Sequence, residues 1–176
     1  MLSDNMQAAL NKQLNAELYS GYLYLSMNAY FKALNLDGFA NWMYYQAQEE
    51  LTHGMKFYDF INQRGGQVSL AQIEAPPTSW ESPLAVFEAT LAHEQKVTGL
   101  INDLMEVALT ERDHATQIFL QWFVSEQVEE EASAGEIVDA IRAQSVVVPG
   151  GKFGAEPAPP GTEFTYTVRL PDRLQS

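Results

Sequence analysis

Four glutamates of this 176-residue sequence interrupt helical stripes of apolar residues. Residues seven apart on a helix lie nearly above one another, and each of these acids has apolar residues seven positions before and after it. The four acids are Glu17, Glu50, Glu94 and Glu130. A single acid could lie at the edge of its stripe and reach water, but four such acids indicate a shared buried position.

Burying four carboxylates requires a source of positive charge. An unpaired ionised carboxylate in a core is unfavourable, and pairing or metal coordination is the usual solution. No Lys or Arg lies on these stripes near the acids, and four facing carboxylates would repel one another. The pattern therefore predicts a cluster of bound cations in the middle of a helical bundle.

A histidine and a repeated spacing strengthen this prediction. His53 follows Glu50 by three residues, so both project from one helix face; alone the match is weak, because a core histidine bonded to a backbone carbonyl is as common. In both halves of the chain an acid is followed by a candidate ligand 33 residues later and another three residues after that. These residues are Glu17, Glu50 and His53 in the first half, and Glu94, Gln127 and Glu130 in the second. We therefore predict two hairpins that repeat one template.

Helical periodicity predicts four long helices, at about 4–34, 37–64, 83–110 and 113–145. Asp37, Ser82 and Asp113 are the predicted N-caps of the last three. The first and third connections are short, so each joins an antiparallel pair. The 17 residues 65–81 could span about 55 Å, more than the roughly 42 Å of a 28-residue helix. We therefore predict an all-α fold, a four-helix bundle with one long crossover.

The composition excludes several kinds of protein and site. With 23 acidic against 10 basic residues and a net charge of −13, the chain is not expected to bind nucleic acid, whose phosphates require basic patches. Without cysteine there can be no disulfide, thiolate metal site or cysteine nucleophile. The first residues lack the pattern of a signal peptide, and no apolar stretch approaches membrane-spanning length. We therefore expect a soluble, cytoplasmic protein without membrane association.

Four segments of the sequence resemble non-haem ferritins of the prokaryotic and archaeal type, members of the ferritin-like di-iron family. The segments are NAELYSGYLYLS, NWMYYQAQEELTHGMKFYDFINQRGG, LAHEQKVT and FLQWFVSEQVEEEA. The resemblance covers residues 1–145 and implies a ferritin-like bundle there. Residues 146–176 form a Gly/Pro-rich tail where such ferritins have a short fifth helix that closes the fourfold channels. The alternation at 163–170 predicts an extended segment, which we expect to dock on the cage or a partner.

The resemblance implies a di-iron ferroxidase centre. Its implied ligands are Glu17, Glu50 and His53 for one iron and Glu50, Glu94 and Glu130 for the other, with Glu50 as the bridge. Gln127 stands where related di-iron proteins carry another carboxylate, so the second iron would have fewer charged ligands and be more labile. Tyr24 matches the family tyrosine beside the centre and could supply an electron, although a tyrosine on such a stripe is ordinarily a core residue.

A third iron position near the centre is also implied by the resemblance. The matching residues are Glu49, Glu126, Glu129 and Glu130. Helical geometry agrees in part, because Glu49 and Glu126 lie at the flanks of their stripes whereas Glu129 turns further toward solvent. A solvated helix face explains Glu129 and Glu131 equally well.

Haem binding is not expected. The methionine that ligates haem in bacterioferritins directly follows the bridging glutamate, and Leu51 stands at that position. The second half also carries Gln-x-x-Glu where bacterioferritins have a second Glu-x-x-His. Trp122 also matches a residue of the family, but we assign it no catalytic role. His93 and His114 are predicted to be surface residues, because neither falls on the axis of its stripe.

The function implied by the resemblance is that of a ferroxidase which oxidises Fe(II) with O2 or H2O2 and stores a ferric mineral inside a homo-oligomeric cage, expected to have 24 subunits. Two alternatives remain open. One is a di-iron oxidase or peroxide-detoxifying enzyme in which storage is secondary, although the lack of cysteines weakens its rubrerythrin version. The other is a structural bundle whose buried acids provide specificity, against which the repeated 33-residue spacing argues.

Overall fold

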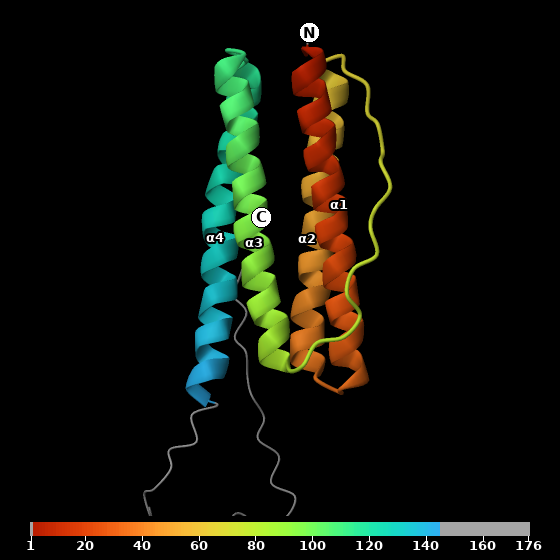
Figure 1. The fold of residues 1–176 in the computed structure, drawn as a ribbon, viewed down its shortest axis with the longest axis vertical. Coiled ribbons are helices and arrows are strands. Elements are labelled where there is room, and N and C mark those ends of the chain that lie inside the picture. The colour runs from red at the N-terminus through yellow and green to blue at the C-terminus, as the bar shows by residue number, and fades with distance from the viewer. Residues whose placement is uncertain (1, 145–176) are drawn as a thin grey trace, which may run out of the picture.

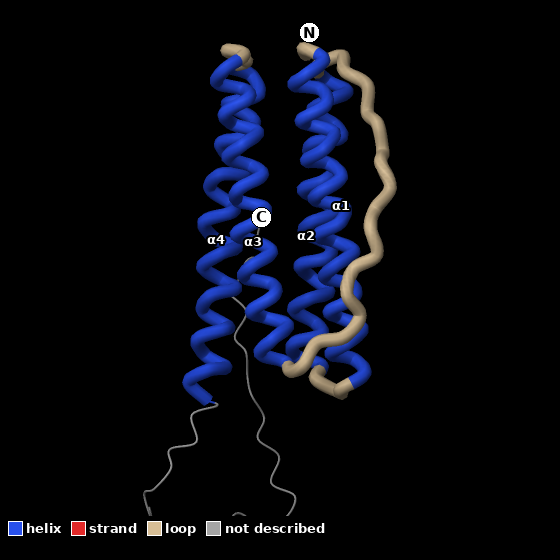
Figure 2. Tube along the Cα trace, viewed as in Figure 1, coloured by secondary structure: helices blue, strands red, loops and turns tan. Residues whose placement is uncertain are grey.

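The computed structural model of the protein describes residues 2–144. Its helices are α1 (Asp4–Ala33), α2 (Asp37–Gln63), α3 (Pro83–Thr110) and α4 (His114–Gln144). They run side by side as a bundle, and residues 2–144 contain no strand (Figure 1, Figure 2). The predicted all-α fold and the positions of the four helices are confirmed. The tail of residues 146–176, with the extended segment predicted at 163–170, lies outside the described residues.

Short polar side chains set where three of the helices begin. Ser3 Oγ accepts a hydrogen bond from the Met6 amide at 3.0 Å at the start of α1. Ser82 Oγ accepts a hydrogen bond from the Ala85 amide at 3.1 Å, and Pro83 takes the first turn of α3. Asp113 Oδ1 accepts one from the Thr116 amide at 3.2 Å and so caps α4 as predicted.

The N-cap predicted for α2 is wrong by one residue. Leu36 occupies the N-cap position and makes no side-chain capping bond, while Asp37 is already helical. The Asp37 carboxylate instead pairs with Lys32 Nζ at 2.7 Å across the turn, and it lies at the positive end of the α2 dipole. The tight turn uses Asn35 in the left-handed region, at φ 56°, which asparagine tolerates better than most residues.

The long connection between α2 and α3 crosses the whole bundle. It runs along α1 from one end to the other (Figure 1). Near its start the Ser69 amide donates to Asn11 Oδ1 at 2.7 Å, and near its end Tyr30 Oη donates to the Trp80 carbonyl at 3.2 Å. The crossover therefore leaves α2 and α3 parallel, while the two short turns make α1–α2 and α3–α4 antiparallel, as predicted.

The hydrophobic core is divided into two clusters by a polar layer. One cluster contains Met6, Leu10, Leu14, Phe57, Ile61, Val97, Ile101, Leu104, Ala108, Leu120 and Phe123. The other contains Leu23, Tyr24, Met27, Phe31, Ala40, Trp42, Met43, Ala47, Val86, Phe87 and Val138. On every helix the buried acid stands between residues of the first cluster and residues of the second. None of the helices in the described range combines the length and apolar character that a membrane-spanning segment needs.

Candidate metal centre

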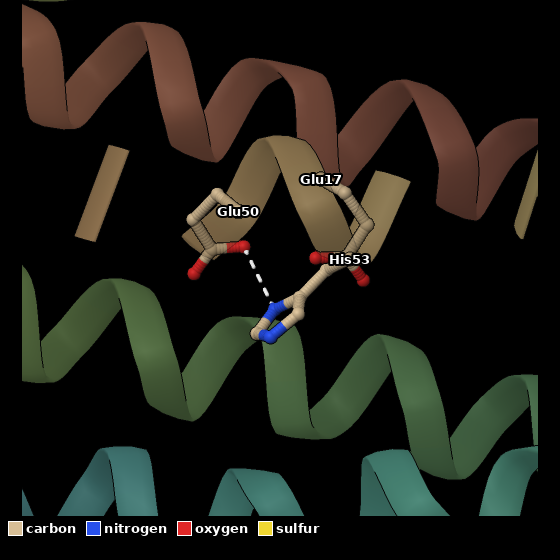
Figure 3. Close-up of side chains that lie close together, drawn as sticks. All are labelled: Glu17, Glu50 and His53. Carbon is tan, nitrogen blue, oxygen red and sulfur yellow. Dashed lines mark ion pairs between the residues drawn. The ribbon is translucent and has the colours of Figure 1, made fainter. Parts of the chain in front are cut away.

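Glu17, Glu50 and His53 form a compact buried group in the polar layer. Each offers a ligand atom, and these atoms all lie within 4.8 Å of one another. Glu17 reaches across from α1 to the two residues of α2 (Figure 3). Their exposed fractions are 1% for Glu17, 2% for Glu50 and 3% for His53. The structure thus brings together the three residues expected to bind one iron.

One carboxylate oxygen of this group lacks a hydrogen bond. Glu50 Oε2 is buried and accepts none, although His53 Nδ1 lies 3.5 Å away. Leaving a buried acceptor unsatisfied is unfavourable, and a cation held by these ligands would satisfy it. The chemistry of the donor set therefore fits a metal ion.

Burial raises the pKa of the carboxyl groups in this layer. It raises the pKa of Glu17 and Glu50 well above the usual range, with the charge of Glu50 adding to the effect on Glu17 and that of Glu94 adding to the effect on Glu50. The pKa of Glu94 is also raised by burial. Burial and the nearby Glu94 raise the pKa of Glu130 to about 8. These carboxyls therefore tend to hold protons that an arriving metal ion would displace.

The imidazole of His53 responds to burial in the opposite direction. Burial lowers its pKa, against the pull of Glu17 and Glu49. A lowered pKa favours the neutral ring, and only neutral imidazole can coordinate a metal. At neutral pH His53 is therefore ready to act as a ligand.

Glu94 and Glu130 are held by hydrogen bonds from neighbouring side chains. Tyr24 Oη donates to Glu94 Oε1, and Gln127 Nε2 lies 3.3 Å from Glu94 Oε2. Gln46 Nε2 donates to Glu130 Oε2 at 2.8 Å. Within residues 2–144 neither acid belongs to a three-residue group as compact as the first. Both are nonetheless buried in the same layer, with exposed fractions of 1% and 7%.

Gln127 presents its amide nitrogen to Glu94. Besides the contact with the carboxylate, Nε2 donates to the Glu94 backbone carbonyl at 3.2 Å. A carbonyl oxygen can only accept, so the contact fixes which end of the amide faces Glu94. Gln127 therefore retains only its Oε1 for a metal ion, a neutral ligand in place of a carboxylate.

Two buried glutamines of the layer are not among the residues predicted from the sequence. Gln13 Nε2 donates to Glu17 Oε1 at 2.8 Å, and Gln46 supports Glu130 from α2. Each is four residues before a predicted ligand, and therefore on the same helix face. That spacing was a signal available in the sequence, because a glutamine on an apolar stripe needs a buried partner.

A second compact group adjoins the first through His53. Glu49, His53 and Glu126 also place ligand atoms within 4.8 Å of one another, with the two acids half-buried. Of the four residues expected at a third iron position, the structure thus gathers Glu49 and Glu126. Glu129 is exposed on α4, and Glu130 is engaged by Gln46.

The prediction that His93 is a surface residue is wrong. It is half-buried against α1, where its Nε2 lies 2.8 Å from Ser20 Oγ and its ring meets the edge of Tyr24. Burial lowers its pKa to about 4. Its neighbour Glu94 points inward, and the contacts of His93 with Ser20 and Tyr24 of α1 cover the adjacent position as well. His114 is exposed, as predicted.

The whole bundle matches a known protein family. The model of the ferritin-like domain family, described as "Ferritin-like domain", matches residues 7–143. This chain belongs to the ferritin-like family. Among similar curated proteins, a bacterial non-heme ferritin of Bacteroides fragilis strain 638R is 47% identical over 142 residues, covering 81% of this chain and 89% of that protein. A bacterial non-heme ferritin of Staphylococcus epidermidis is 44% identical over 141 residues, covering 80% and 85%.

Solved structures show the same fold for this ferritin-like chain. An open pore ferritin from the archaeon Archaeoglobus fulgidus superposes with a TM-score of 0.82 at 54% identity, covering 84% of this chain and 91% of that one. Chlorobium tepidum ferritin superposes with a TM-score of 0.79 at 39% identity, covering 81% and 87%. The resemblance to prokaryotic and archaeal non-haem ferritins is confirmed, and the bundle that carries the buried acids is the part that matches.

Proposed function

We propose that this protein is a ferroxidase, an Fe(II):oxygen oxidoreductase that oxidises Fe(II) with O2 or H2O2 and stores the product as a ferric mineral inside an oligomeric cage. The observation that carries the proposal is the buried group of Glu17, Glu50 and His53 with its unsatisfied carboxylate oxygen. Membership of the ferritin-like family supports the same conclusion.

Two Fe(II) ions are the substrates in this proposal. One is bound by Glu17, Glu50 and His53, and the other by Glu50 with Glu94, Glu130 and the neutral oxygen of Gln127. Mixed carboxylate and imidazole ligands suit Fe(II). Each ion gives up one electron, so the pair reduces O2 to H2O2, or H2O2 to two water molecules, with uptake of two protons in either case.

The raised pKa values of the carboxyls suit this proton balance. Glu17 and Glu50 release protons when they become ligands, because burial holds their pKa values well above the usual range. Those protons are released next to the iron ions, where the reduction of O2 or H2O2 takes up protons. Tyr24, whose hydroxyl donates to Glu94, is our candidate for supplying an electron during the reduction of O2.

We assign the third iron position to the second compact group. Glu49 and Glu126 supply its carboxylates and His53 links it to the first group. Ferric ions are small and highly charged, and they prefer oxygen ligands. A half-buried acidic position beside the centre is therefore suited to ions that leave it.

Association of copies of the chain into the proposed cage, expected to have 24 subunits, is supported by an exposed apolar surface on α1 and α2. Tyr22, Leu25 and Leu51 are 49%, 46% and 53% exposed and line a groove there. Such a patch marks an association surface, and we assign it to a second copy of the chain. The proposal places the protein in the cytoplasm, without haem, nucleic acid or membrane as partner. A Leu51→Glu variant should sediment as smaller particles than the wild type.

A peroxide-consuming or O2-consuming di-iron enzyme is the competing function. The two functions differ in the fate of the oxidised iron. We expect aerobic loading with Fe(II) to leave far more iron in each particle than its binding sites could hold. Retention of only a few ions per subunit would favour the competing function.

The site assignment is tested by substituting its bridging ligand. Glu50→Ala, or the isosteric Glu50→Gln, should abolish fast Fe(II) oxidation, followed by stopped-flow absorbance. Glu106→Ala removes an exposed glutamate of α3 and should leave the rate unchanged. An unchanged rate in both Glu50 variants would overturn the assignment.

A further inference from the structure

A lysine is held over an aromatic ring beside the metal-binding groups. Lys56 Nζ lies 2.9 Å from the centroid of the Trp122 ring. Such cation–π contacts fix an ammonium in place, more strongly when it is partly desolvated, and Lys56 is half-buried. Among residues 2–144 it forms no ion pair within 4.0 Å, so the ring rather than a carboxylate determines its position.

Helical register places this pair next to the group of Glu49, His53 and Glu126. Lys56 follows Glu49 by seven residues and His53 by three, so all three lie on one face of α2. Trp122 precedes Glu126 by four residues on α4, which runs antiparallel to α2. The Trp122 ring in turn meets the His53 ring edge-on, with centroids 5.2 Å apart. The ammonium therefore lies about one helical turn from the metal-binding atoms.

The charge of Lys56 and the charges of the metal-binding group act on each other. Burial lowers the pKa of Lys56, while Glu126 and Glu49 raise it, which means that they favour its charged form. Lys56 in turn acts to lower the pKa of His53. A divalent cation bound by Glu49, His53 and Glu126 would be repelled by the same ammonium that the empty carboxylates attract.

We propose that Lys56, fixed by Trp122, is a built-in countercharge that weakens metal binding at the group of Glu49, His53 and Glu126. Its effect is to make this group a position of low affinity and rapid exchange, through which ions pass rather than remain. Lys56 is thus a positioning and affinity-setting residue, and it coordinates no ion itself. The inference rests on the proposed function, in which this group is the third iron position.

The test is anaerobic titration of the assembled protein with Co2+ alone, followed by calorimetry. In Glu126→Gln, binding of Co2+ to the group of Glu49, His53 and Glu126 should be lost. The class of binding sites that disappears from the titration is therefore the one that belongs to this group. Lys56→Met, and Lys56→Gln as a second variant in case the first fails to fold, should tighten the same class about five- to tenfold at low salt. Release of Co2+ to a chelator should slow by a similar factor. Lys56→Arg keeps the charge and should bind as the wild type does.

Two further measurements separate a charge effect from a structural one. Added salt should reduce the difference between Lys56→Met and the wild type, because ions in solution partly screen the charge of the half-buried ammonium. In the Glu126→Gln background, Lys56→Met should no longer change Co2+ affinity. Unchanged or weaker binding in both neutral variants would overturn the inference. If neither Glu50→Ala nor Glu126→Gln altered Co2+ binding, the proposed function itself would fail.

Discussion

Gln46 on α2 and Glu130 on α4 are joined across the bundle by a 2.8 Å hydrogen bond from the amide Nε2 to the carboxylate Oε2. Both side chains are buried, and the bond lowers the pKa of Glu130 against the larger effect of burial. The glutamine therefore supports the ionised form of Glu130, which is the form that binds metal.

Replacing Gln46 by leucine should weaken binding of the second metal ion. A hydrogen bond to a charged group contributes about 1.5–3 kcal/mol, so we expect roughly tenfold or greater loss of affinity in anaerobic Co2+ titrations at pH 7. Gln48→Leu changes an exposed glutamine of the same helix and serves as the control. Equal affinity in the two variants would show that the bond does not support the site.

The metal-free protein should lose stability as the pH rises from 6.5 to 8. Folded Glu130 keeps its proton up to about pH 8, whereas an unfolded glutamate releases it near 4.3. The folded state thus binds more protons, and the stability this gives is lost as the pH rises through the folded pKa. The lowered pKa values of His53 and His93 act in the opposite sense below 6.5, so the test lies above that pH.

For Glu130 alone the change between these pH values is about 2 kcal/mol in the free energy of unfolding. Urea denaturation at a fixed subunit concentration measures it. Glu130→Gln should flatten the dependence, and so should a saturating divalent metal, which replaces the proton. A stability that rises over this interval would contradict the assigned protonation states.

Thr98 should matter for the orientation of Gln127. Its hydroxyl has one proton, which it donates to Glu131 Oε1 at 2.5 Å, so it must accept from Gln127 Nε2, 3.3 Å away. Thr98→Val removes both bonds and should cost about 1 kcal/mol of stability, with severalfold weaker binding of the second metal. Thr98→Ser keeps the hydroxyl and should retain both properties. Urea unfolding and Co2+ titration of the two variants distinguish these outcomes.

Gly54 should tolerate no large side chain, because α1 and α2 approach closely beside the metal centre. A Cβ at this position would lie 3.3 Å from Leu18 Cδ2 and 3.6 Å from Glu17 Cβ. Gly54→Val should therefore destabilise the protein by about 1–3 kcal/mol and, by displacing Glu17, weaken binding at the first iron position.

The matched control for Gly54 is Gly99. A Cβ there would meet nothing within 4 Å, so Gly99→Ala in α3 should stabilise the protein by about 0.5–1 kcal/mol through helix propensity alone. Thermal unfolding of both variants checks the pair. Similar effects at the two positions would show that helix–helix contact does not determine the choice of glycine at 54.

The positions of the helices and the burial of the four acids follow from the sequence, because both are local properties. A stripe of period 3.6 determines which residues share a helix face, and a glutamate on its axis must be buried when the stripe is. The length of the crossover likewise determined that α2 and α3 are parallel. Glu17, Glu50, Glu94 and Glu130 could therefore be predicted from spacing alone, and the structure places all four in one layer.

Contacts between helices were decided by the tertiary structure. Which residues meet depends on the axial offset and rotation of neighbouring helices, and no periodicity within one helix specifies these. This is why the burial of His93 against Ser20, the bond from Gln46 to Glu130 and the contact of Lys56 with Trp122 were not predicted. The sequence determined which side chains face the bundle interior, and only the packing of the helices decided which of them can share an ion.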